Sequence, residues 1–313
     1  MKCLLILFFF LLPFGASQAQ DSTDVEAVQR MVQLSEVVVR SNLNVTSFLQ
    51  RIKTDTTFYK AFRNLRVLGF TAHNDIRMFD KRGRTSATLQ SKTKQNVSGG
   101  CRTMQVLEET HSGDLYKNGE WNYYTAEMYA SLFFTKGKVC GETNIVKGVE
   151  RSLRNKNGIQ KHKEQLKMLF FNPGKKISGI PLMGDKLDIF DPRIAKHYNY
   201  TIDIVNFNGQ QCYFFDIQAK EDLNVFERNS IVFNKITTWF NTKTMEIVAR
   251  NYDLSYSAGV YDFDVQMEVE MTHFAGLLVP QVLRYRGNWD VAVKKRERGV
   301  FTATLSDFNA GAK

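Results

Sequence analysis

Cysteine is scarce in this chain, with four residues among 313. Cys3 lies in a predicted leader, which leaves Cys101, Cys140 and Cys212. An odd number excludes complete pairing, and three widely spaced cysteines exclude a small disulfide-rich scaffold. No CxxC or CxxH spacing is present, so no zinc site is predicted. Cys101 and Cys140 both neighbour glycines in predicted turns and could bridge, although the sequence leaves their pairing open.

Motifs of established catalytic chemistry are also missing. The chain has no GxSxG elbow and no P-loop, and none of its five histidines forms HxxxH, HExxH or HxH. Two histidines lie near a carboxylate, His73 with Asp75 and His111 with Asp114, as an acid–base pair requires. Both pairs lie in turn or strand-edge contexts where these residue types are common. We therefore predict no catalytic residue, no cofactor and no metal.

Long apolar runs are confined to the N-terminus. Residues 4–12 are uncharged and apolar, Lys2 precedes them, and Ser17 and Ala19 provide the small residues of a cleavage site. These parts make a secretory signal peptide, predicted to span residues 1–19 with cleavage near Ala19. The run is shorter than the roughly 20 residues of a spanning helix. The protein is therefore predicted to be exported to the periplasm or to the periphery of the outer membrane.

Acidic residues are fewer than lysine and arginine residues, which gives a net charge of +10. In an exported protein this charge favours anionic head groups or acidic glycans over nucleic acid, and it permits peripheral membrane contact. The densest basic cluster, at residues 294–298, is predicted to lie in a loop or at a strand end. The sequence does not determine the oligomeric state.

The first part of the mature chain is predicted to be helical. A helix is expected at residues 21–33, followed by an extended stretch at residues 34–39. Helical spacing returns from Asn44, and a further helix is expected after Thr56. The sequence therefore predicts an N-terminal helical segment at residues 20–65, followed by a single α+β domain at residues 66–313.

That domain is predicted to consist mainly of antiparallel strands. A hairpin is expected at residues 66–96 with its tip at residues 80–83, and Asn208-Gly209 marks another hairpin. Helices are expected at residues 121–134, 158–171 and 191–197, and further strands at residues 104–110, 198–207, 211–219, 230–240, 245–256, 260–273, 278–286 and 300–308. The short connections between the later strands require antiparallel neighbours.

The most informative strand covers residues 260–273. Apolar and polar residues alternate almost without exception over these fourteen positions, so one face of the strand is apolar and the other is polar. A strand of this length, about 45 Å, suits a strongly curved sheet of the half-barrel type. A tight turn after it would place Glu268 opposite Arg284 and Gln266 opposite Arg286. This pairing explains the acidic ladder without a metal ion.

Aromatic side chains gather on the last strands, where they fill the core or line a hydrophobic groove. The predicted ligand-binding residues of such a groove are Trp239, Tyr252, Tyr256, Phe263, Met267, Tyr285 and Trp289.

The hairpin sequences at residues 237–248 and 278–285 resemble those of LolA-like lipoprotein-sorting half-barrels. The resemblance covers residues 198–308 and implies a curved sheet, covered by helices, that binds acyl chains or other lipophilic cargo. The whole chain also resembles uncharacterised exported proteins of Bacteroidota, in which a stretch like Glu36–Val39 occurs.

Three functions follow as hypotheses. The first is a non-enzymatic exported protein that binds a lipophilic ligand or an envelope partner. The second is an accessory or scaffold subunit of an outer-membrane complex, which requires an exposed apolar patch or a long unpaired edge strand. The third is an envelope hydrolase that uses one of the two histidine–aspartate pairs.

Overall fold

A twelve-stranded curved sheet dominates the computed structural model, which describes residues 16–41, 43–146, 168–177, 180, 183–258, 261–291 and 296–311. Its strands are β1 (Val32–Leu34), β2 (Gly69–Phe79), β3 (Thr85–Ser98), β4 (Cys101–Gly113), β7 (Val139–Cys140), β8 (Tyr198–Phe207), β9 (Gln210–Ala219), β10 (Phe233–Asn241), β11 (Ile247–Ala258), β12 (Tyr261–Phe274), β13 (Leu277–Val291) and β14 (Glu297–Asn309). Their order is β1-β8-β9-β10-β11-β12-β13-β14-β2-β3-β4-β7, and a separate hairpin joins β5 (Tyr116–Lys117) to β6 (Glu120–Trp121). Only the pairing of β1 with β8 is parallel among these strands. The fold is therefore α+β, as predicted.

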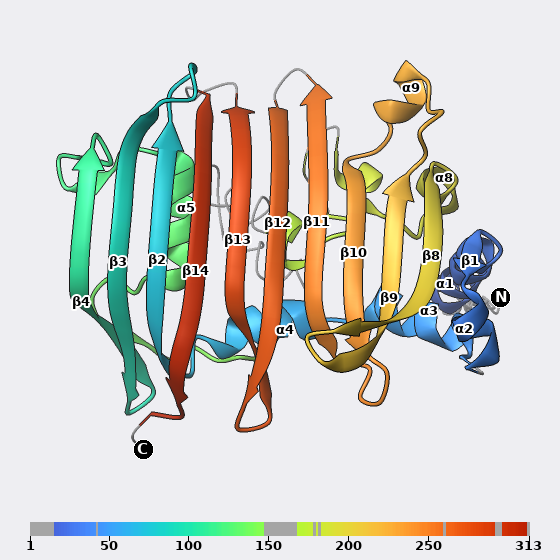
Figure 1. The fold of residues 1–313 in the computed structure, drawn as a ribbon, viewed down its shortest axis with the longest axis horizontal. Helices are drawn as coiled ribbons and strands as arrows, with labels where there is room; N and C mark the ends of the chain where they lie inside the picture. Colours follow the sequence, from blue (N-terminus) through green and yellow to red (C-terminus); the bar gives the residue numbers. More distant parts are fainter. Residues whose placement is uncertain are drawn as a thin grey trace, which may run out of the picture.

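The described helices lie on one face of the sheet, beside its β8 edge or beyond the ends of its strands (Figure 1). They are α1 (Ala16–Gln29), α2 (Glu36–Arg40), α3 (Val45–Thr54), α4 (Thr57–Asn64), α5 (Tyr124–Phe133), the 3-10 helix η1 (Gly184–Leu187), α8 (Pro192–Ala195) and α9 (Val225–Arg228). Helices α4 and α5 lie behind the strands in Figure 1, and no described helix lies in front of them. None of the described helices is long and apolar enough to cross a membrane. The sequence-predicted leader up to residue 15 and most of the helix predicted at residues 158–171 lie outside the described residues.

Strand β12 defines the two faces of the sheet. Its apolar residues Phe263, Val265, Met267 and Val269 are all buried, and they lie on the face that the helices cover, which we call the inner face. Its acidic residues lie on the opposite, outer face. The inner face is thus a covered core layer and not an open groove.

The register of β12 and β13 confirms the predicted pairing. Glu268 lies opposite Arg284, and Gln266 lies opposite Arg286. The Arg284 guanidinium is 2.7 Å from Glu270 and 3.6 Å from Glu268. No group of described histidine, cysteine or acidic residues could hold a metal ion. Cross-strand charge pairing therefore accounts for the acidic ladder.

Two facing glycines allow aromatic rings to lie flat on the inner face. Gly287 of β13 pairs with Gly299 of β14, and beside them Tyr285 pairs with Phe301. A Cβ atom at Gly287 would lie 1.9 Å from the Tyr285 hydroxyl, and one at Gly299 would lie 2.9 Å from the Phe301 ring. The two rings are stacked with their centroids 5.0 Å apart. The absence of side chains at these positions thus makes room for the aromatic pair.

The N-terminal segment differs from prediction at residues 34–39. The β-branched run was expected to be extended, yet Glu36–Arg40 forms helix α2 after a short strand β1. Ser35 caps this helix, because its hydroxyl accepts a hydrogen bond from the Val38 amide. A good N-cap therefore overrides the modest strand preference of three valines.

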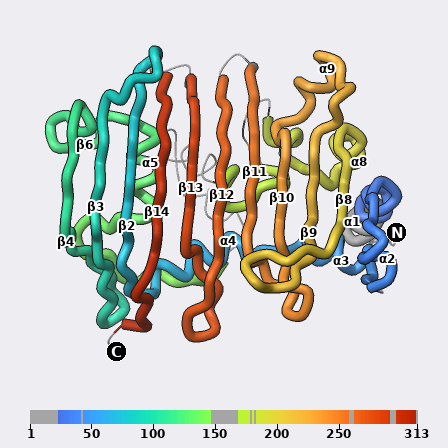
Figure 2. The backbone as a smooth tube through the Cα atoms, viewed as in Figure 1, coloured from blue at the N-terminus to red at the C-terminus, as the bar shows by residue number. Residues whose placement is uncertain are grey.

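The sheet remains open at both edges. The long strands β4 and β8 lie at opposite ends of the sheet (Figure 2). The strand β1 pairs with only three residues of β8, and β7 pairs with only Cys101 and Arg102 of β4. A disulfide joins Cys101 to Cys140 across the β4–β7 pair, whereas Cys212 is a buried free cysteine. The disulfide thus holds the short strand β7 against the edge of the sheet.

Candidate functional site

Six of the seven predicted ligand-binding residues lie together on the inner face. They are buried there and come from three adjacent strands: Tyr252, Tyr256, Phe263, Met267, Tyr285 and Trp289. The structure does not bring Trp239 into this group. Trp239 lies on the outer face, where its ring packs against Phe207 and Phe214 at centroid distances of 4.8 and 5.6 Å.

Residues 168–171 pack directly on this inner group. The Phe170 ring lies 5.8 Å from the Tyr285 ring and 6.2 Å from the Trp289 ring. The Tyr252 hydroxyl donates a 2.8 Å hydrogen bond to the Phe170 carbonyl. Burial raises the pKa of Tyr252 well above its ordinary value, so this hydroxyl stays protonated and acts as a donor.

Helix α5 covers the neighbouring strands and is held by groups from β14 and β2. Its N-cap position, Tyr123, makes no side-chain cap. The Glu297 carboxylate takes that role from β14, because it accepts hydrogen bonds of 2.8 Å from the amides of Tyr124 and Thr125. Farther along, the Tyr129 hydroxyl lies 3.0 Å from the Asn74 side-chain oxygen. Polar contacts from the sheet thus hold this helix over an apolar surface.

A small apolar cavity lies between α5 and the sheet. Its volume is about 30 Å³. The side chains that line it include Met128, Leu132, Met267, Tyr285 and Phe301. Typical ligand pockets measure about 300–1,000 Å³. A lipophilic molecule would therefore need α5 to move away from the sheet, and flexible methionine side chains on both walls would help the layer to adapt.

A second inner cavity, of about 40 Å³, lies on the other side of Leu132. Helix α5 contributes Ser131 and Leu132 to its wall, and α4 contributes Tyr59, Phe62 and Arg63. The cavity is lined by three arginines as well as by aromatic and aliphatic side chains. Leu132 is common to both cavities, so a displacement of α5 would join them.

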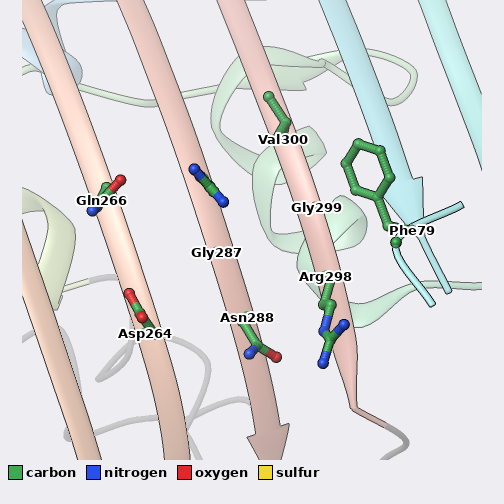
Figure 3. A pocket seen from close by; sticks show the side chains of 10 residues that line it. Phe79, Asp264, Gln266, Gly287, Asn288, Arg298, Gly299 and Val300 are labelled. Atoms are coloured by element: carbon green, nitrogen blue, oxygen red, sulfur yellow. The ribbon is translucent and has the colours of Figure 1, made fainter. Parts of the chain in front are cut away.

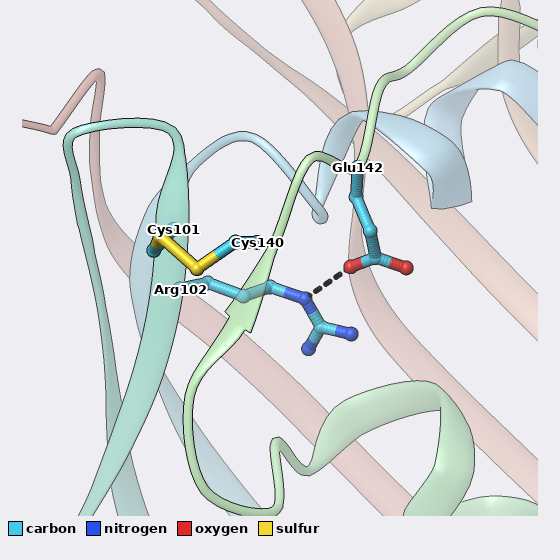
Figure 4. The surroundings of a disulfide bond; sticks show 4 residues. All are labelled: Cys101, Arg102, Cys140 and Glu142. Carbon is cyan, nitrogen blue, oxygen red and sulfur yellow. Dashed lines mark hydrogen bonds and ion pairs between the residues drawn. A yellow bond between two sulfur atoms is a disulfide. The ribbon is translucent and has the colours of Figure 1, made fainter.

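The arginines of the second cavity surround one carboxylate. Glu142 lies 2.6 Å from the Nε atom of Arg102 (Figure 4). It also lies 2.9 Å from Nη1 of Arg66. Burial alone would raise the pKa of Glu142, but the hydrogen bond from Arg102 and the charges of Arg66, Arg102 and Arg63 hold it below its ordinary value. Burial and the charge of Arg63 lower the pKa of Arg66.

Sequence reasoning did not predict this arginine cluster. Arg63 and Arg66 follow each other at helical spacing, but Arg102 and Glu142 come from separate segments. The only local signal was the pair of cysteines, because Cys101 immediately precedes Arg102 and Cys140 lies two residues before Glu142. A predicted bridge between them would have placed these charges close together.

The outer face carries a larger hollow of about 650 Å³. Polar side chains line it, among them Asp264, Gln266, Asn288 and Arg298 (Figure 3). Burial, and then the charge of Asp253, raise the pKa of Asp264, whereas Arg286 opposes this shift. Phe79 and Val300 also line it, so the lining combines charged, polar and apolar side chains.

The two predicted histidine–aspartate pairs do not form. His73 is exposed on the outer face, where Arg77 binds the Asp75 carboxylate through two contacts of 2.8 Å. His111 lies opposite the buried Leu89, and its imidazole is 3.3 Å from Glu109. Among the described residues, no hydrogen bond or ion pair joins either histidine to its predicted aspartate. The two imidazoles lie on opposite faces, and neither meets the aspartate of its candidate pair, so these two pairs give the hydrolase hypothesis no support.

Glu297→Ala should loosen α5. The variant loses the hydrogen bonds that Glu297 accepts from the first amides of the helix and from the Thr125 hydroxyl, the last at 2.7 Å. We expect a local loss of about 1–2 kcal/mol, seen as faster hydrogen exchange of the α5 amides. Glu120→Ala is the matched control, because this exposed carboxylate pairs with the exposed Lys136. Unchanged exchange in Glu297→Ala would contradict this role.

Comparisons with known proteins give a faint likeness only. No protein-family model matches the chain, and no curated protein matches it. Three similar solved structures are a DUF1329 family protein from Desulfovibrio piger (10% identity, TM-score 0.24), an outer-membrane lipoprotein-sorting protein domain from Vibrio parahaemolyticus (12%, 0.25) and a LolA superfamily protein from Nitrosomonas europaea (9%, 0.23). In the same order, the matches cover 82%, 80% and 82% of this chain, and 93%, 90% and 94% of the chains in those three structures.

Two of these structures are described as lipoprotein-sorting or LolA superfamily proteins. This is the family whose hairpins the C-terminal hairpins of this chain resemble. All three TM-scores lie far below 0.5, so the function is inferred from the contacts within this chain.

Proposed function

We propose that this chain is an exported, non-enzymatic envelope protein that binds a lipophilic ligand between helix α5 and the inner face of the sheet. The observation that carries the proposal is the apolar cavity under α5, which the methionine and aromatic side chains of α5, β12, β13 and β14 enclose. A lipid chain there would replace contacts between side chains by equivalent apolar contacts, with little loss of burial.

Binding would proceed by displacement of α5. The helix rests on the apolar layer, and groups of the sheet hold it at two places: Glu297 accepts hydrogen bonds from its first amides, and Asn74 and Thr302 accept hydrogen bonds from Tyr129. Both attachments involve groups on the sheet and could re-form after release. The second cavity, which shares Leu132, would then extend the space available to the ligand.

Native mass spectrometry of the purified protein, with organic extraction of any bound lipid, tests this proposal. We expect bound lipophilic molecules, or saturable uptake of a long-chain monoacylglycerol when none is carried over. A tryptophan at position 132 should compete with the ligand, because Leu132 lies between the two cavities. The matched control is Leu107→Trp on the exposed edge strand. Absence of uptake by the wild-type protein would refute the proposal.

A second function is favoured by the edge strand β4. Beyond Arg102, β4 has no described strand on its outer side, and Val106 and Leu107 are 52% and 42% exposed. Glu108 and Glu109 follow these apolar residues and are also exposed. Such an edge suits an extended basic segment of an envelope protein that pairs as an additional strand. Hydrogen exchange of the β4 amides in an isolated envelope complex tests this function, and unprotected amides would exclude it.

A further inference from the structure

Three guanidinium groups converge on one carboxylate at the second inner cavity. Arg63 and Arg66 come from the end of α4 and the turn after it, Arg102 comes from β4, and Glu142 follows β7. Glu142 pairs with Arg66 and Arg102 at 2.9 and 2.6 Å. Arg102 also donates to the Thr135 hydroxyl. Among the described residues that line this cavity or pair with its arginines, three cations share the single carboxylate of Glu142, which gives an excess of positive charge.

Arg63 is the member of the cluster with unused hydrogen-bonding capacity. Its Nη2 atom donates a 2.7 Å hydrogen bond to the Thr143 carbonyl. Its Nε atom is buried and has no hydrogen-bond partner, one of two such side-chain atoms in the described part of the chain. A buried donor without an acceptor is unfavourable, and an anionic oxygen would satisfy it.

The arginine cluster lies at the boundary between the apolar layer under α5 and the solvent. Phe62, Phe171 and Leu132 belong to the same cavity wall as the arginines. The Arg66 side chain is 39% exposed, whereas that of Arg102 is 17% exposed. A ligand held here would place its charged end at the arginines near water, and its apolar end past Leu132 beneath α5.

We infer that Arg63, Arg66 and Arg102 bind the anionic head group of a single-chain amphiphile whose acyl chain occupies the apolar layer under α5. This inference rests on the proposed function and names its ligand class. Guanidinium groups bind carboxylate and phosphate oxygens through paired hydrogen bonds, so a fatty acid and a lysophospholipid share the required chemistry. Glu142 occupies the site when no ligand is bound and competes with the head group.

Binding of three probes to the full mature chain tests this assignment. The probes are palmitate, lysophosphatidic acid and the neutral monopalmitoylglycerol, titrated by calorimetry below their aggregation concentrations. We expect the wild-type protein to prefer an anionic probe over the neutral one by about tenfold. Preference for palmitate identifies a fatty-acid head group, and preference for lysophosphatidic acid identifies a phosphate.

Variants with opposite effects separate ligand binding from a structural role. Arg63→Met should abolish the anionic preference and leave the affinity for the neutral probe unchanged. Glu142→Gln removes the competing carboxylate and should tighten anionic binding by several-fold, although a purely structural ion-pair network predicts a loss. Arg66→Gln provides a second, more exposed substitution if Arg63→Met does not fold. Arg51→Gln is the matched control, because this exposed arginine of α3 lies outside the cluster.

The outcomes distinguish this inference from the proposed function. Equal affinity for neutral and anionic probes would overturn the head-group assignment and leave lipophile binding intact. An unchanged anionic preference in Arg63→Met, or weaker anionic binding in Glu142→Gln, would also overturn it. Failure to bind any probe would refute the proposed function itself.

Discussion

Replacing both Cys101 and Cys140 by serine should lower the free energy of unfolding by about 4 kcal/mol. The two cysteines are 39 residues apart in sequence, and their disulfide removes the corresponding loop entropy from the unfolded chain. Strand β7 pairs with only two residues of β4, so the covalent link reinforces a short ladder and the ion pairs of Glu142 that follow it. Denaturant unfolding of the oxidised wild type and the double variant measures the difference.

Reduction provides the internal control for this prediction. Dithiothreitol should destabilise the wild type to the level of the double variant and leave the double variant unchanged. Cys212→Ala, which removes the buried free thiol, should keep the sensitivity to reduction. A double variant as stable as the oxidised wild type would show that the 39-residue loop does not contribute to stability in this way.

Tyr285→Ala should lower the free energy of unfolding by a similar amount, about 4 kcal/mol, because it opens a cavity in the inner layer. The Tyr285 ring stacks on Phe301, lies over Gly287, and accepts a hydrogen bond from the Trp289 indole. The new space adjoins the cavity under α5. We therefore also expect Tyr285→Ala to bind a lipophilic probe more readily than the wild type, measured by the same titration.

Trp239→Ala is the matched control for Tyr285→Ala. Both substitutions remove an aromatic ring from a predicted ligand-binding position, but Trp239 packs on the outer face. Its loss should cost no more than about 2 kcal/mol and leave lipophile binding unchanged. An equal effect of the two substitutions on binding would contradict a site restricted to the inner face.

The sheet was the most predictable part of the molecule. Alternation along β12 separated its two faces, and the short turn after it gave the correct pairing of Glu268 with Arg284. These features depend on residues close together in sequence. The helical conformation of residues 36–40 was missed because one capping hydrogen bond from Ser35 outweighs the preference of the valine side chains.

The site was only partly predictable. Trp239 and Phe240 are adjacent aromatic residues in β10, so an aromatic pattern alone does not say which one lies on the inner face. The arginine cluster was missed for a different reason. Its members come from three segments that only the completed fold and the Cys101–Cys140 disulfide bring together.

Strand β14 joins two halves of the sheet that are synthesised at different times. On one side it pairs with β13, which immediately precedes it, and on the other with β2, where Thr302 lies opposite Asp75. The strands β2 to β4 therefore cannot join the rest of the sheet until β14 has been synthesised. Such long-range pairing makes folding of the complete sheet slow. A late-folding sheet of this kind is compatible with passage through an export channel before the native structure forms.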